Sequence, residues 1–235
     1  MPEDDPVLLI TGASSGIGAA TARRAGEAGY RLVLGARRED RVRELATELG
    51  GDGRAVGVRC DVTEWEDNRV LVQRALDAFG RIDAVFANAG FGARRGFLEE
   101  SPEHWRSMVL TNVLGVAFTI RATLGHMLER GTGHYLLTSS VAGRRTLPGS
   151  VYSATKWAVS AMGEALRSEL RQMHDNSRIR VTLIEPGMTD TEFFSERPKD
   201  ALMDDDLARA LIYALSEPER VEVNEILIRP ISQAG

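Results

Sequence analysis

The chain alternates short runs of aliphatic and β-branched residues with longer segments of helical periodicity. Seven such runs lie at 7–10, 31–35, 55–60, 82–87, 134–139, 180–185 and 225–230. Helices are expected between them at about 16–29, 39–49, 64–79, 103–130, 152–174 and 205–216, with Thr63 and Glu66 as a capping box for the third. This alternation is typical of βαβ units. We therefore predict an α/β fold built on a parallel sheet.

No internal repeat or low-complexity linker interrupts the 235 residues, and this length suits one α/β domain. We expect a single domain over 1–235. The long irregular stretch at about 187–205 is interpreted as a substrate lid, since loops of this length are usually functional. Met188, Phe193 and Phe194 could form its apolar inner face or pack beneath it.

The composition narrows the possible partners. A net charge of -5 disfavours a broad nucleic-acid surface, which needs clustered Lys and Arg. No uninterrupted apolar run approaches the roughly 20 residues that span a bilayer, and the acidic start of the chain does not resemble a secretion signal. The single cysteine, Cys60, suits a reducing compartment, so we expect a cytoplasmic protein. Because the charge and the apolar pattern favour neither nucleic acid nor a membrane, we expect a small-molecule substrate. The four scattered histidines indicate no metal site.

The first strand leads into three glycines, Gly12, Gly16 and Gly18, within the run VLLITGASSGIG. In a parallel sheet this turn directs helix amides and the positive end of the helix dipole toward an anion. The spacing differs from the usual G-x-G-x-x-G of dinucleotide-binding folds. Taken alone, the glycines fit a phosphate-binding loop and an ordinary flexible turn equally well.

The end of the second strand bears on the choice of cofactor. Folds that prefer NAD usually carry an acidic residue here to bind the ribose 2′-hydroxyl. This chain has Ala36 followed by Arg37 and Arg38. Arginine can hold a 2′-phosphate through charge-assisted hydrogen bonds. We therefore favour NADP binding by Arg37 and Arg38 over the alternative that both are solvated surface charges. Ser15, where many NADP-preferring proteins have a basic residue, leaves dual cofactor use possible.

Tyr152 and Lys156 are four residues apart, so a helix places them on one face. A nearby ammonium stabilises a phenolate and would lower the tyrosine pKa toward neutrality. Such a pair is frequent by chance, but here it follows a strand, a serine pair and a glycine-containing loop. The sequence therefore predicts a general acid/base at Tyr152.

Together these motifs resemble the short-chain dehydrogenase/reductase family, and the resemblance covers nearly the whole chain. They are T-G-x-x-x-G-x-G at 11–18, Asp61-Val62, Asn88-Ala89-Gly90, Asn112, Ser140, Tyr152, Lys156 and Pro186-Gly187. The family's cofactor turn has this altered glycine spacing. The resemblance implies a Rossmann-type, doubly wound parallel sheet of seven strands with helices on both faces. It also implies an NADP-dependent oxidoreductase that interconverts a small alcohol or hydroxy acid and its carbonyl compound.

The resemblance implies roles for four catalytic residues. Tyr152 would be the acid/base, Ser140 would hydrogen-bond the reacting oxygen, and Lys156 would lower the tyrosine pKa and bind the nicotinamide ribose. Asn112 would anchor a water in a proton relay, or make a polar packing contact. The gap from Ser140 to Tyr152 is one residue shorter than in close relatives. Ser139 would restore it, but Ser140 fits the local S-x-x-G pattern.

The implied cofactor site spans several loops. Asp61 and Val62 would flank the adenine, although Asp61 could instead cap its turn, and Thr191 would lie near the nicotinamide carboxamide. The full predicted set is Gly12, Ser14, Ser15, Gly16, Ile17, Gly18, Arg37, Arg38, Asp61, Val62, Asn88, Ala89, Gly90, Tyr152, Lys156, Pro186, Gly187, Thr189 and Thr191.

Two arginine pairs, Arg94-Arg95 and Arg144-Arg145, follow the fourth and fifth strands. One pair could bind an anionic substrate such as a hydroxy or keto acid, or all four could be solvated loop charges. The carboxyl end, VNEILIRP, is similar to small NADP-dependent members that oxidise hydroxy acids or reduce aldehydes.

Two alternatives remain open at the level of the sequence: a related isomerase or dehydratase, which usually needs a longer chain, and a catalytically silent NADP-binding regulator. The resemblance further implies a homodimer or homotetramer through the two long helices around the fifth strand. Ala158, Ala161, Met162 and Ala165 give the second helix a small apolar side that suits such an interface or the core.

Overall fold

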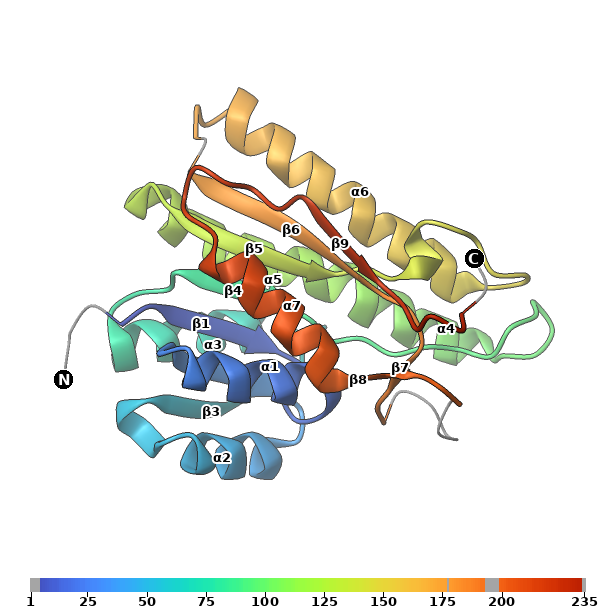
Figure 1. Cartoon of the computed structure of the whole chain (residues 1–235), viewed down its shortest axis with the longest axis horizontal. Helices are drawn as coiled ribbons and strands as arrows, with labels where there is room; N and C mark the ends of the chain where they lie inside the picture. Colours follow the sequence, from blue (N-terminus) through green and yellow to red (C-terminus); the bar gives the residue numbers. More distant parts are fainter. Residues whose placement is uncertain (1–4, 177, 193–198, 234–235) are drawn as a thin grey trace.

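A seven-stranded parallel sheet forms the centre of the molecule, which is described here by a computed structural model (Figure 1). Residues 5–176, 178–192 and 199–233 are described. The strand order is β3-β2-β1-β4-β5-β6-β9. The strands are β1 Val7–Thr11, β2 Arg31–Ala36, β3 Ala55–Arg59, β4 Ala84–Ala87, β5 Gly133–Thr138, β6 Ile179–Pro186 and β9 Glu225–Ile228. The predicted doubly wound α/β fold is confirmed, with each of the seven expected strands in place.

Helices cover both faces of this sheet. One apolar cluster joins the sheet to α3, α5 and α6, and a second joins its other face to α1, α2 and α7. The helices are α1 Gly16–Glu27, α2 Glu39–Glu48, α3 Trp65–Phe79, α4 Pro102–Val109, α5 Gly115–Arg130, α6 Val151–Gln172 and α7 Asp204–Ser216. Aliphatic strands such as β1 are buried along their whole length because helices lie on both sides.

The strand order reverses between the neighbours β1 and β4. The strands β2 and β3 lie beyond β1, whereas β5, β6 and β9 lie beyond β4. Ligands of open α/β sheets bind at the carboxyl ends of the strands beside such a switch point. The turn after β1 and the segment after β4 therefore adjoin one crevice. The register pairs Thr11 with Ala87, which places Gly12 and Asn88 side by side.

Local details differ from the expected elements. The helix predicted over 103–130 is α4 and α5 joined by a π-helical turn, Leu110–Leu114. The capping box is wrong: α3 begins after Glu64, and the Thr63 hydroxyl donates to Asp61 instead (2.8 Å). Two short strands, β7 Thr189–Asp190 and β8 Leu202–Met203, pair within the irregular stretch at 187–205. Of the residues expected in its apolar face, Phe193 and Phe194 lie outside the described residues.

The continuous helix Pro102–Arg130 is apolar enough, by length and composition alone, to span a membrane. Its most apolar 18-residue window has a mean hydropathy of 1.4. An expectation based only on uninterrupted apolar runs does not identify this window. A core helix of a soluble protein meets the same criterion. This helix packs against α3, β4 and β5, and 33% of the window is buried, while other residues such as Ile120 and Leu124 are half-buried against the core.

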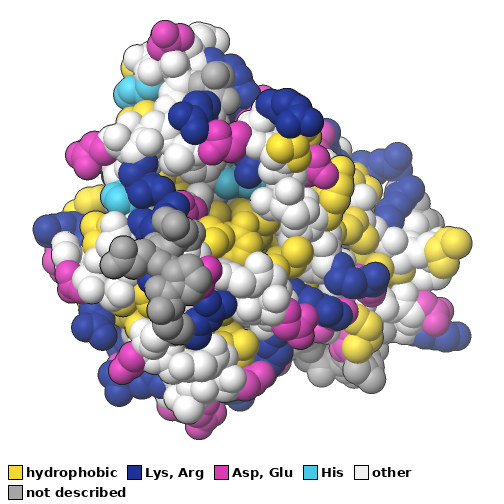
Figure 2. Space-filling model, turned by 60° about the vertical axis from the view of Figure 1, so that its left-hand side comes forward, with side chains coloured by type: hydrophobic (Ala, Val, Ile, Leu, Met, Phe, Trp, Pro, Cys, Tyr) yellow, Lys and Arg dark blue, Asp and Glu magenta, His cyan; other side chains and the backbone are white. Residues whose placement is uncertain are grey.

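Charges of both signs are mixed on the surface. On the face shown in Figure 2, Lys and Arg side chains lie among Asp and Glu, without a broad area of one sign. Many are paired, as in the bonds from Arg23 to Glu48 and from Arg178 to Glu219. This pattern lacks the clustered positive charge that phosphate backbones attract.

Candidate active site

The glycine turn after β1 is shaped by close backbone approach. Gly12 and Gly16 have φ values of +69° and +52°, which favour glycine. A Cβ on Gly12 would lie 2.8 Å from the Ala89 Cα, and one on Gly18 would lie 2.3 Å from the Gly12 carbonyl oxygen. The first turn of α1 can therefore approach the strand end only with glycine at these positions.

Asn88 braces the same turn from the neighbouring strand. Its amide donates to the carbonyl oxygens of Thr11 and Gly12, both at 3.4 Å, and its own carbonyl accepts from Thr138 (3.2 Å). Asn88 thus ties the ends of β1, β4 and β5 together. This role is structural, and the cofactor contact predicted for Asn88 stays a prediction.

The arginines after β2 have separate environments. Arg38 donates to the hydroxyls of Ser14 (2.9 Å) and Ser15 (2.7 Å), and so lies against the glycine turn. Arg37 is exposed. Arg41, one helical turn further along α2, joins Arg38 on the Glu192 carboxylate (2.7 Å). Sequence reasoning missed Arg41, although its spacing of three residues from Arg38 places both on one side of the helix start.

These residues fit the phosphates of a dinucleotide. Ser15 precedes α1 without a capping bond from its side chain, and the first turn of α1 contains no acidic residue. The helix dipole therefore favours negative charge at the start of α1, where backbone amides point out of the helix. Arg38 adds a guanidinium at the edge of the turn. Ile17 is partly buried and packs onto the core behind the turn.

Tyr152 and Lys156 lie together on the first turns of α6, as predicted. The Lys156 Nζ is 5.7 Å from the centre of the Tyr152 ring and donates to the Thr138 carbonyl (2.7 Å). Burial lowers the pKa of Lys156 to about 8. Burial also raises the pKa of Tyr152 to about 12, against a smaller lowering by the Ser140 hydrogen bond. The predicted lowering of the tyrosine pKa is therefore wrong, because desolvation of the phenolate dominates.

The two serines after β5 point to different partners. The Ser140 hydroxyl hydrogen-bonds Tyr152 and lies 3.3 Å from the Pro186 carbonyl oxygen. The Ser139 hydroxyl is fully buried, donates to the Lys156 carbonyl (3.0 Å) and contacts Ser160. Of these two hydroxyls, that of Ser140 is the one that contacts Tyr152, and its catalytic role stays a prediction.

Asn112 lies in the π-helical turn, a feature frequent at functional sites. Its amide donates to the Phe91 carbonyl (2.9 Å) and to Thr155 (3.1 Å), and its carbonyl accepts from the Phe91 amide (3.0 Å). A Cβ on Gly90 would lie 3.0 Å from the Asn112 Oδ1 and 3.7 Å from the Lys156 Nζ. Asn112 therefore holds the segment after β4 beside the lysine.

The residues after β3 serve the local turn. The Asp61 carboxylate accepts from the Thr63 amide (3.0 Å) and hydroxyl, which is the capping role considered for it. Val62 is buried, and a Cβ on Gly115 would lie 2.6 Å from it. Contact of this pair with adenine stays a prediction.

The segment after β6 covers the opposite side of the crevice. Pro186 ends β6, and the Gly187 amide donates to the Ile228 carbonyl (2.7 Å). The Met188 amide donates to Gln233 (2.9 Å), a contact from the carboxyl end that the sequence did not indicate. Thr189 is buried, and a Cβ on Gly16 would lie 3.1 Å from Thr191. Residues 193–198 of the predicted lid lie outside the described residues.

The four arginines of the two predicted pairs have different surroundings in the structure. Arg144 is bonded to the buried Glu185 (2.7 Å) and to Glu225, so it ties the Ser140 loop to β6 and β9. Arg94 pairs with Glu100 (3.6 Å), while Arg95 and Arg145 are exposed. The substrate role considered for Arg144 is thus not supported, since its guanidinium is already engaged. In the described part of the chain, no three His, Cys, Asp or Glu residues are grouped for a metal ion.

The sequence profile described as short chain dehydrogenase matches residues 6–202. An uncharacterized oxidoreductase of Staphylococcus saprophyticus is 40% identical over 244 residues, covering 98% of each chain. An alcohol dehydrogenase from Thermococcus sibiricus, solved with 5-hydroxy-NADP, is 34% identical with a TM-score of 0.87 and 98% coverage of both chains. A short chain dehydrogenase/reductase from Burkholderia phymatum, solved with NAD, is 28% identical with a TM-score of 0.85, covering 97% of this chain and 90% of that one.

The glycine turn and the arrangement of Ser140, Tyr152 and Lys156 fit the same family that these likenesses indicate. A nicotinamide cofactor is supported by the solved relatives, which hold forms of NADP or NAD. The chain is an oxidoreductase and belongs to the short-chain dehydrogenase/reductase family.

Proposed function

We propose that the protein is an NADP(H)-dependent oxidoreductase that interconverts a small alcohol or hydroxy acid and its carbonyl compound. The observation that carries this proposal is the placement of Tyr152, Ser140 and Lys156 at the carboxyl edge of the sheet, across the crevice from the glycine turn and Arg38. The likeness to an alcohol dehydrogenase supports the class of substrate.

Tyr152 carries the proton in this mechanism. With a pKa near 12 its hydroxyl is protonated at neutral pH, so it can donate to a carbonyl oxygen. Ser140, already hydrogen-bonded to Tyr152, can donate to the same oxygen. The Lys156 ammonium then stabilises the phenolate that remains. A bound nicotinamide cofactor supplies or accepts the hydride, and the protein positions the reactants.

The preference for NADP rests on Arg38 and Arg41. Both guanidinium groups meet beside the glycine turn, and Ala36 stands where NAD-preferring folds usually have a carboxylate. A carboxylate there would repel a 2′-phosphate, whereas two arginines attract it. Discrimination between NADP and NAD therefore depends on these two side chains.

An anionic substrate is a second element of the proposal. Arg95 and Arg145 are exposed and follow β4 and β5, on the sheet edge that holds Tyr152. Either could bind the carboxylate of a hydroxy or keto acid. If so, Arg145→Ala would raise KM for keto acids more than for neutral carbonyl compounds of matched size. Equal losses on both substrates would remove the idea.

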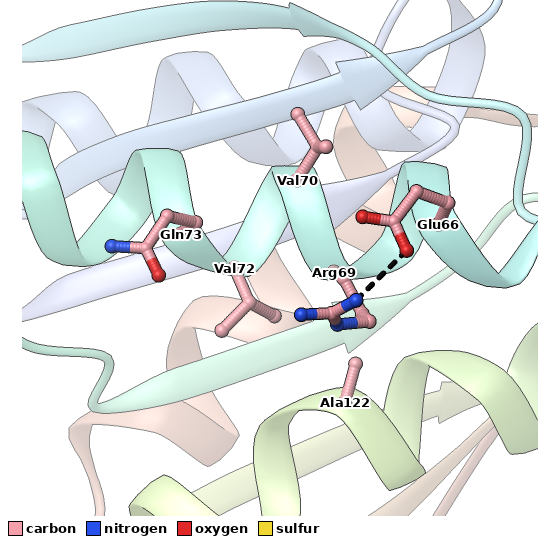
Figure 3. Close-up of a pocket in the computed structure, with 6 residues that line it drawn as sticks. All are labelled: Glu66, Arg69, Val70, Val72, Gln73 and Ala122. Carbon is pink, nitrogen blue, oxygen red and sulfur yellow. Dashed lines mark hydrogen bonds and ion pairs between the residues drawn. The ribbon is translucent and has the colours of Figure 1, made fainter.

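We further propose a homodimer or homotetramer formed through α5 and α6. Ala161, Ala165 and Trp157 of α6 are exposed rather than part of the core. A depression of about 300 Å³ between α3 and α5 lies on the face of the sheet that α6 also covers, it is not lined by Tyr152, and it would receive partner side chains (Figure 3). Sedimentation analysis would show the assembly.

A cytoplasmic location is also proposed. Cys60 is the single cysteine of the chain, and burial raises the pKa of its thiol to about 12. One cysteine cannot form a disulfide within this sequence, which suits a reducing compartment. Fractionation of the native host would test this.

The function is tested by following NADPH and NADH oxidation with a panel of aldehydes, ketones and keto acids. We expect turnover with NADPH, and a loss of about 10²- to 10⁴-fold in kcat for Tyr152→Phe with cofactor binding retained. Undiminished turnover by Tyr152→Phe would contradict the mechanism. Turnover with NADH alone would contradict the cofactor preference.

A further inference from the structure

A carboxylate from the segment after β7 occupies the two arginines beside the glycine turn. Glu192 Oε2 accepts from Arg38 Nη1 (2.7 Å), and Glu192 Oε1 accepts from Arg41 Nη1 (2.7 Å). Glu192 also hydrogen-bonds Ser15, and together these contacts lower the pKa of Glu192 to about 2. The carboxylate is therefore ionised at neutral pH and bridges both guanidinium groups.

The neighbouring residue places this segment over the turn itself. Thr191 lies against Gly16, whose added Cβ would approach it to 3.1 Å. Thr191 and Glu192 follow β7, which is fixed to β8 by the bond from the Leu202 amide to the Met188 carbonyl (3.0 Å). The contact with Arg38 and Arg41 thus links the glycine turn to the chain that continues from the Pro186 side of the crevice.

We propose that Glu192 is an internal competitor of the adenosine 2′-phosphate, which displaces it from Arg38 and Arg41 when NADP binds. This inference rests on the proposed NADP preference and adds a consequence to it. Binding of the phosphate frees the segment of Thr191 and Glu192 from the glycine turn. The 2′-hydroxyl of NAD carries no charge and leaves the contact between Glu192 and the arginines in place.

The balance of charges favours displacement. The Glu192 and Arg38 side chains are 53% and 42% exposed, and exposed ion pairs contribute only about 0.2–1 kcal/mol each. A phosphate carries up to two negative charges and three acceptor oxygens, so it can satisfy both guanidinium groups better than one carboxylate. Glu192 should therefore weaken NADP binding without preventing it.

The competition can be measured without catalysis. Calorimetric titration would compare 2′,5′-ADP with 5′-ADP on the wild type and on Glu192→Gln, which keeps the shape but removes the charge. We expect Glu192→Gln to bind 2′,5′-ADP about three- to tenfold more tightly, with 5′-ADP affinity unchanged. The matched control is Glu39→Gln, because the Glu39 carboxylate forms its ion pair with Arg43 (2.5 Å), whereas Arg38 and Arg41 pair with Glu192. It should stay within about twofold of the wild type.

A second readout follows the segment itself. Amide hydrogen exchange of the peptide that contains Thr191 and Glu192 should rise when wild-type protein is saturated with 2′,5′-ADP, and not with 5′-ADP. In Glu192→Gln the exchange should already be raised in the free protein. Because this measurement needs neither substrate nor turnover, it reports the displacement directly.

The outcomes separate the two proposals. If the wild type prefers 2′,5′-ADP but Glu192→Gln binds it no more tightly, Glu192 does not compete, and the NADP preference stands. If neither protein distinguishes the two nucleotides, the arginines do not bind the phosphate, and both proposals are overturned. Tighter binding by Glu39→Gln equal to that of Glu192→Gln would show a general charge effect and would also overturn the inference.

Discussion

Ser139 and Ser140 both follow the end of β5 at Thr138, but their hydroxyls meet different partners. Ser139 is fully buried beneath α6, where its hydroxyl bonds the Lys156 carbonyl. Ser140 precedes a short 3-10 turn, Val141–Gly143, and reaches Tyr152. The first serine secures the helix that carries Tyr152 and Lys156, and the second is the one proposed to donate to the reacting oxygen.

Single alanine substitutions should separate these roles. Ser140→Ala should lower kcat by about 10²- to 10³-fold, as expected for loss of one donor to a reacting oxygen. Ser139→Ala should keep most of the turnover and lose about 1 kcal/mol in the free energy of unfolding. Steady-state kinetics and denaturant unfolding of both variants check this. A full loss of turnover from Ser139→Ala alone would reverse the assignment.

Lys156 is held at a cost to the fold. Its folded pKa of about 8 lies below the value of 10.5 for an ordinary lysine, so the unfolded state holds the proton more tightly. The buried ammonium is therefore destabilising below pH 8. That penalty disappears as the pH rises from about 8 to 10.5, where the folded protein has lost a proton that the unfolded chain still binds.

Lys156→Met should accordingly be inactive but more stable than the wild type by about 1–3 kcal/mol at pH 7. Its advantage should shrink as the pH rises from 8 to 10, since the other groups titrate equally in both proteins. Urea unfolding at several pH values measures the difference. A difference that stays constant over this range would show that Lys156 is not the buried charge described.

At the scale of elements, the glycine turn depends on two segments meeting without side chains. The turn after β1 presses on the segment after β4, and α1 begins against the carbonyl of Gly12. The π-helical turn between α4 and α5 likewise positions a segment of the crevice, because it places Asn112 against the Phe91 backbone. Both features depart from regular backbone geometry, and they bring the predicted cofactor-binding and catalytic residues close to one another.

Gly18→Ala should therefore weaken nucleotide binding at least about tenfold and lower stability, because backbone atoms must shift to admit the Cβ. The matched control is Gly125→Ala in α5, where nothing lies within 4 Å of the added Cβ. It should be stabilising by about 0.5–1 kcal/mol, the usual gain of alanine over glycine in a helix. Calorimetric binding and thermal unfolding test the pair. Normal nucleotide affinity in Gly18→Ala would contradict the close approach.

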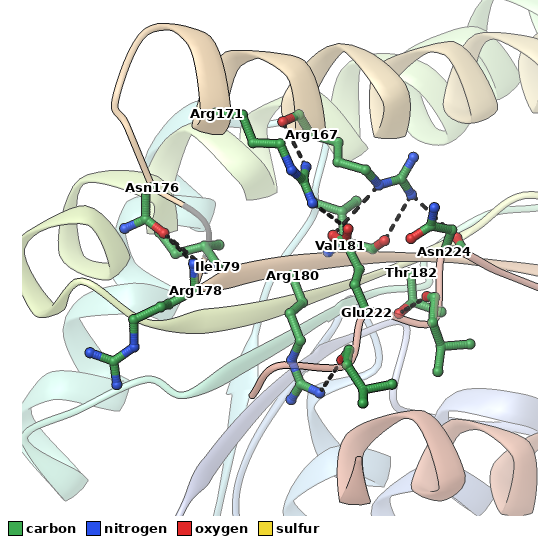
Figure 4. A network of polar contacts seen from close by, with 12 residues as sticks. Arg167, Arg171, Asn176, Arg178, Ile179, Arg180, Val181, Thr182, Glu222 and Asn224 are labelled. Carbon is green, nitrogen blue, oxygen red and sulfur yellow. Dashed lines mark hydrogen bonds and ion pairs between the residues drawn. The ribbon is translucent and has the colours of Figure 1, made fainter. Parts of the chain in front are cut away.

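At the scale of the whole molecule, the far end of α6 is tied to β6 and to the chain before β9 by a polar network (Figure 4). Arg167 is only 8% exposed, donates to the Val181 carbonyl (2.8 Å) and pairs with Glu222 (3.6 Å). Arg171 also pairs with Glu222. These contacts fix the long helix whose first turns carry Tyr152 and Lys156.

Arg167→Ala should lower the free energy of unfolding by about 2–4 kcal/mol, because it leaves a partly buried Glu222 and the carbonyls of Val181 and Asn224 with fewer partners. At temperatures where the variant is folded, KM and kcat should change little, since the site lies at the other end of α6. Arg178→Ala is the control, because its bond with Glu219 is exposed and its loss should cost less than about 1 kcal/mol. Similar losses in both variants would contradict the anchoring role.

The sequence by itself determined the order of strands and helices, the glycine turn and the spacing of Tyr152 and Lys156. These follow from local periodicity and from residue types that few backbone positions accept. The element boundaries agree within a few residues, and three of the four predicted catalytic side chains, Ser140, Tyr152 and Lys156, converge in space.

Only the tertiary structure decided how those residues are partnered. It assigned Asp61 to a cap and Arg144 to Glu185, turned Ser139 away, and raised rather than lowered the pKa of Tyr152. It also brought Glu192 to Arg38 and Arg41, across more than 150 residues of chain. Desolvation and long-range ion pairs depend on which surfaces fold together, and no local pattern in the chain encodes that.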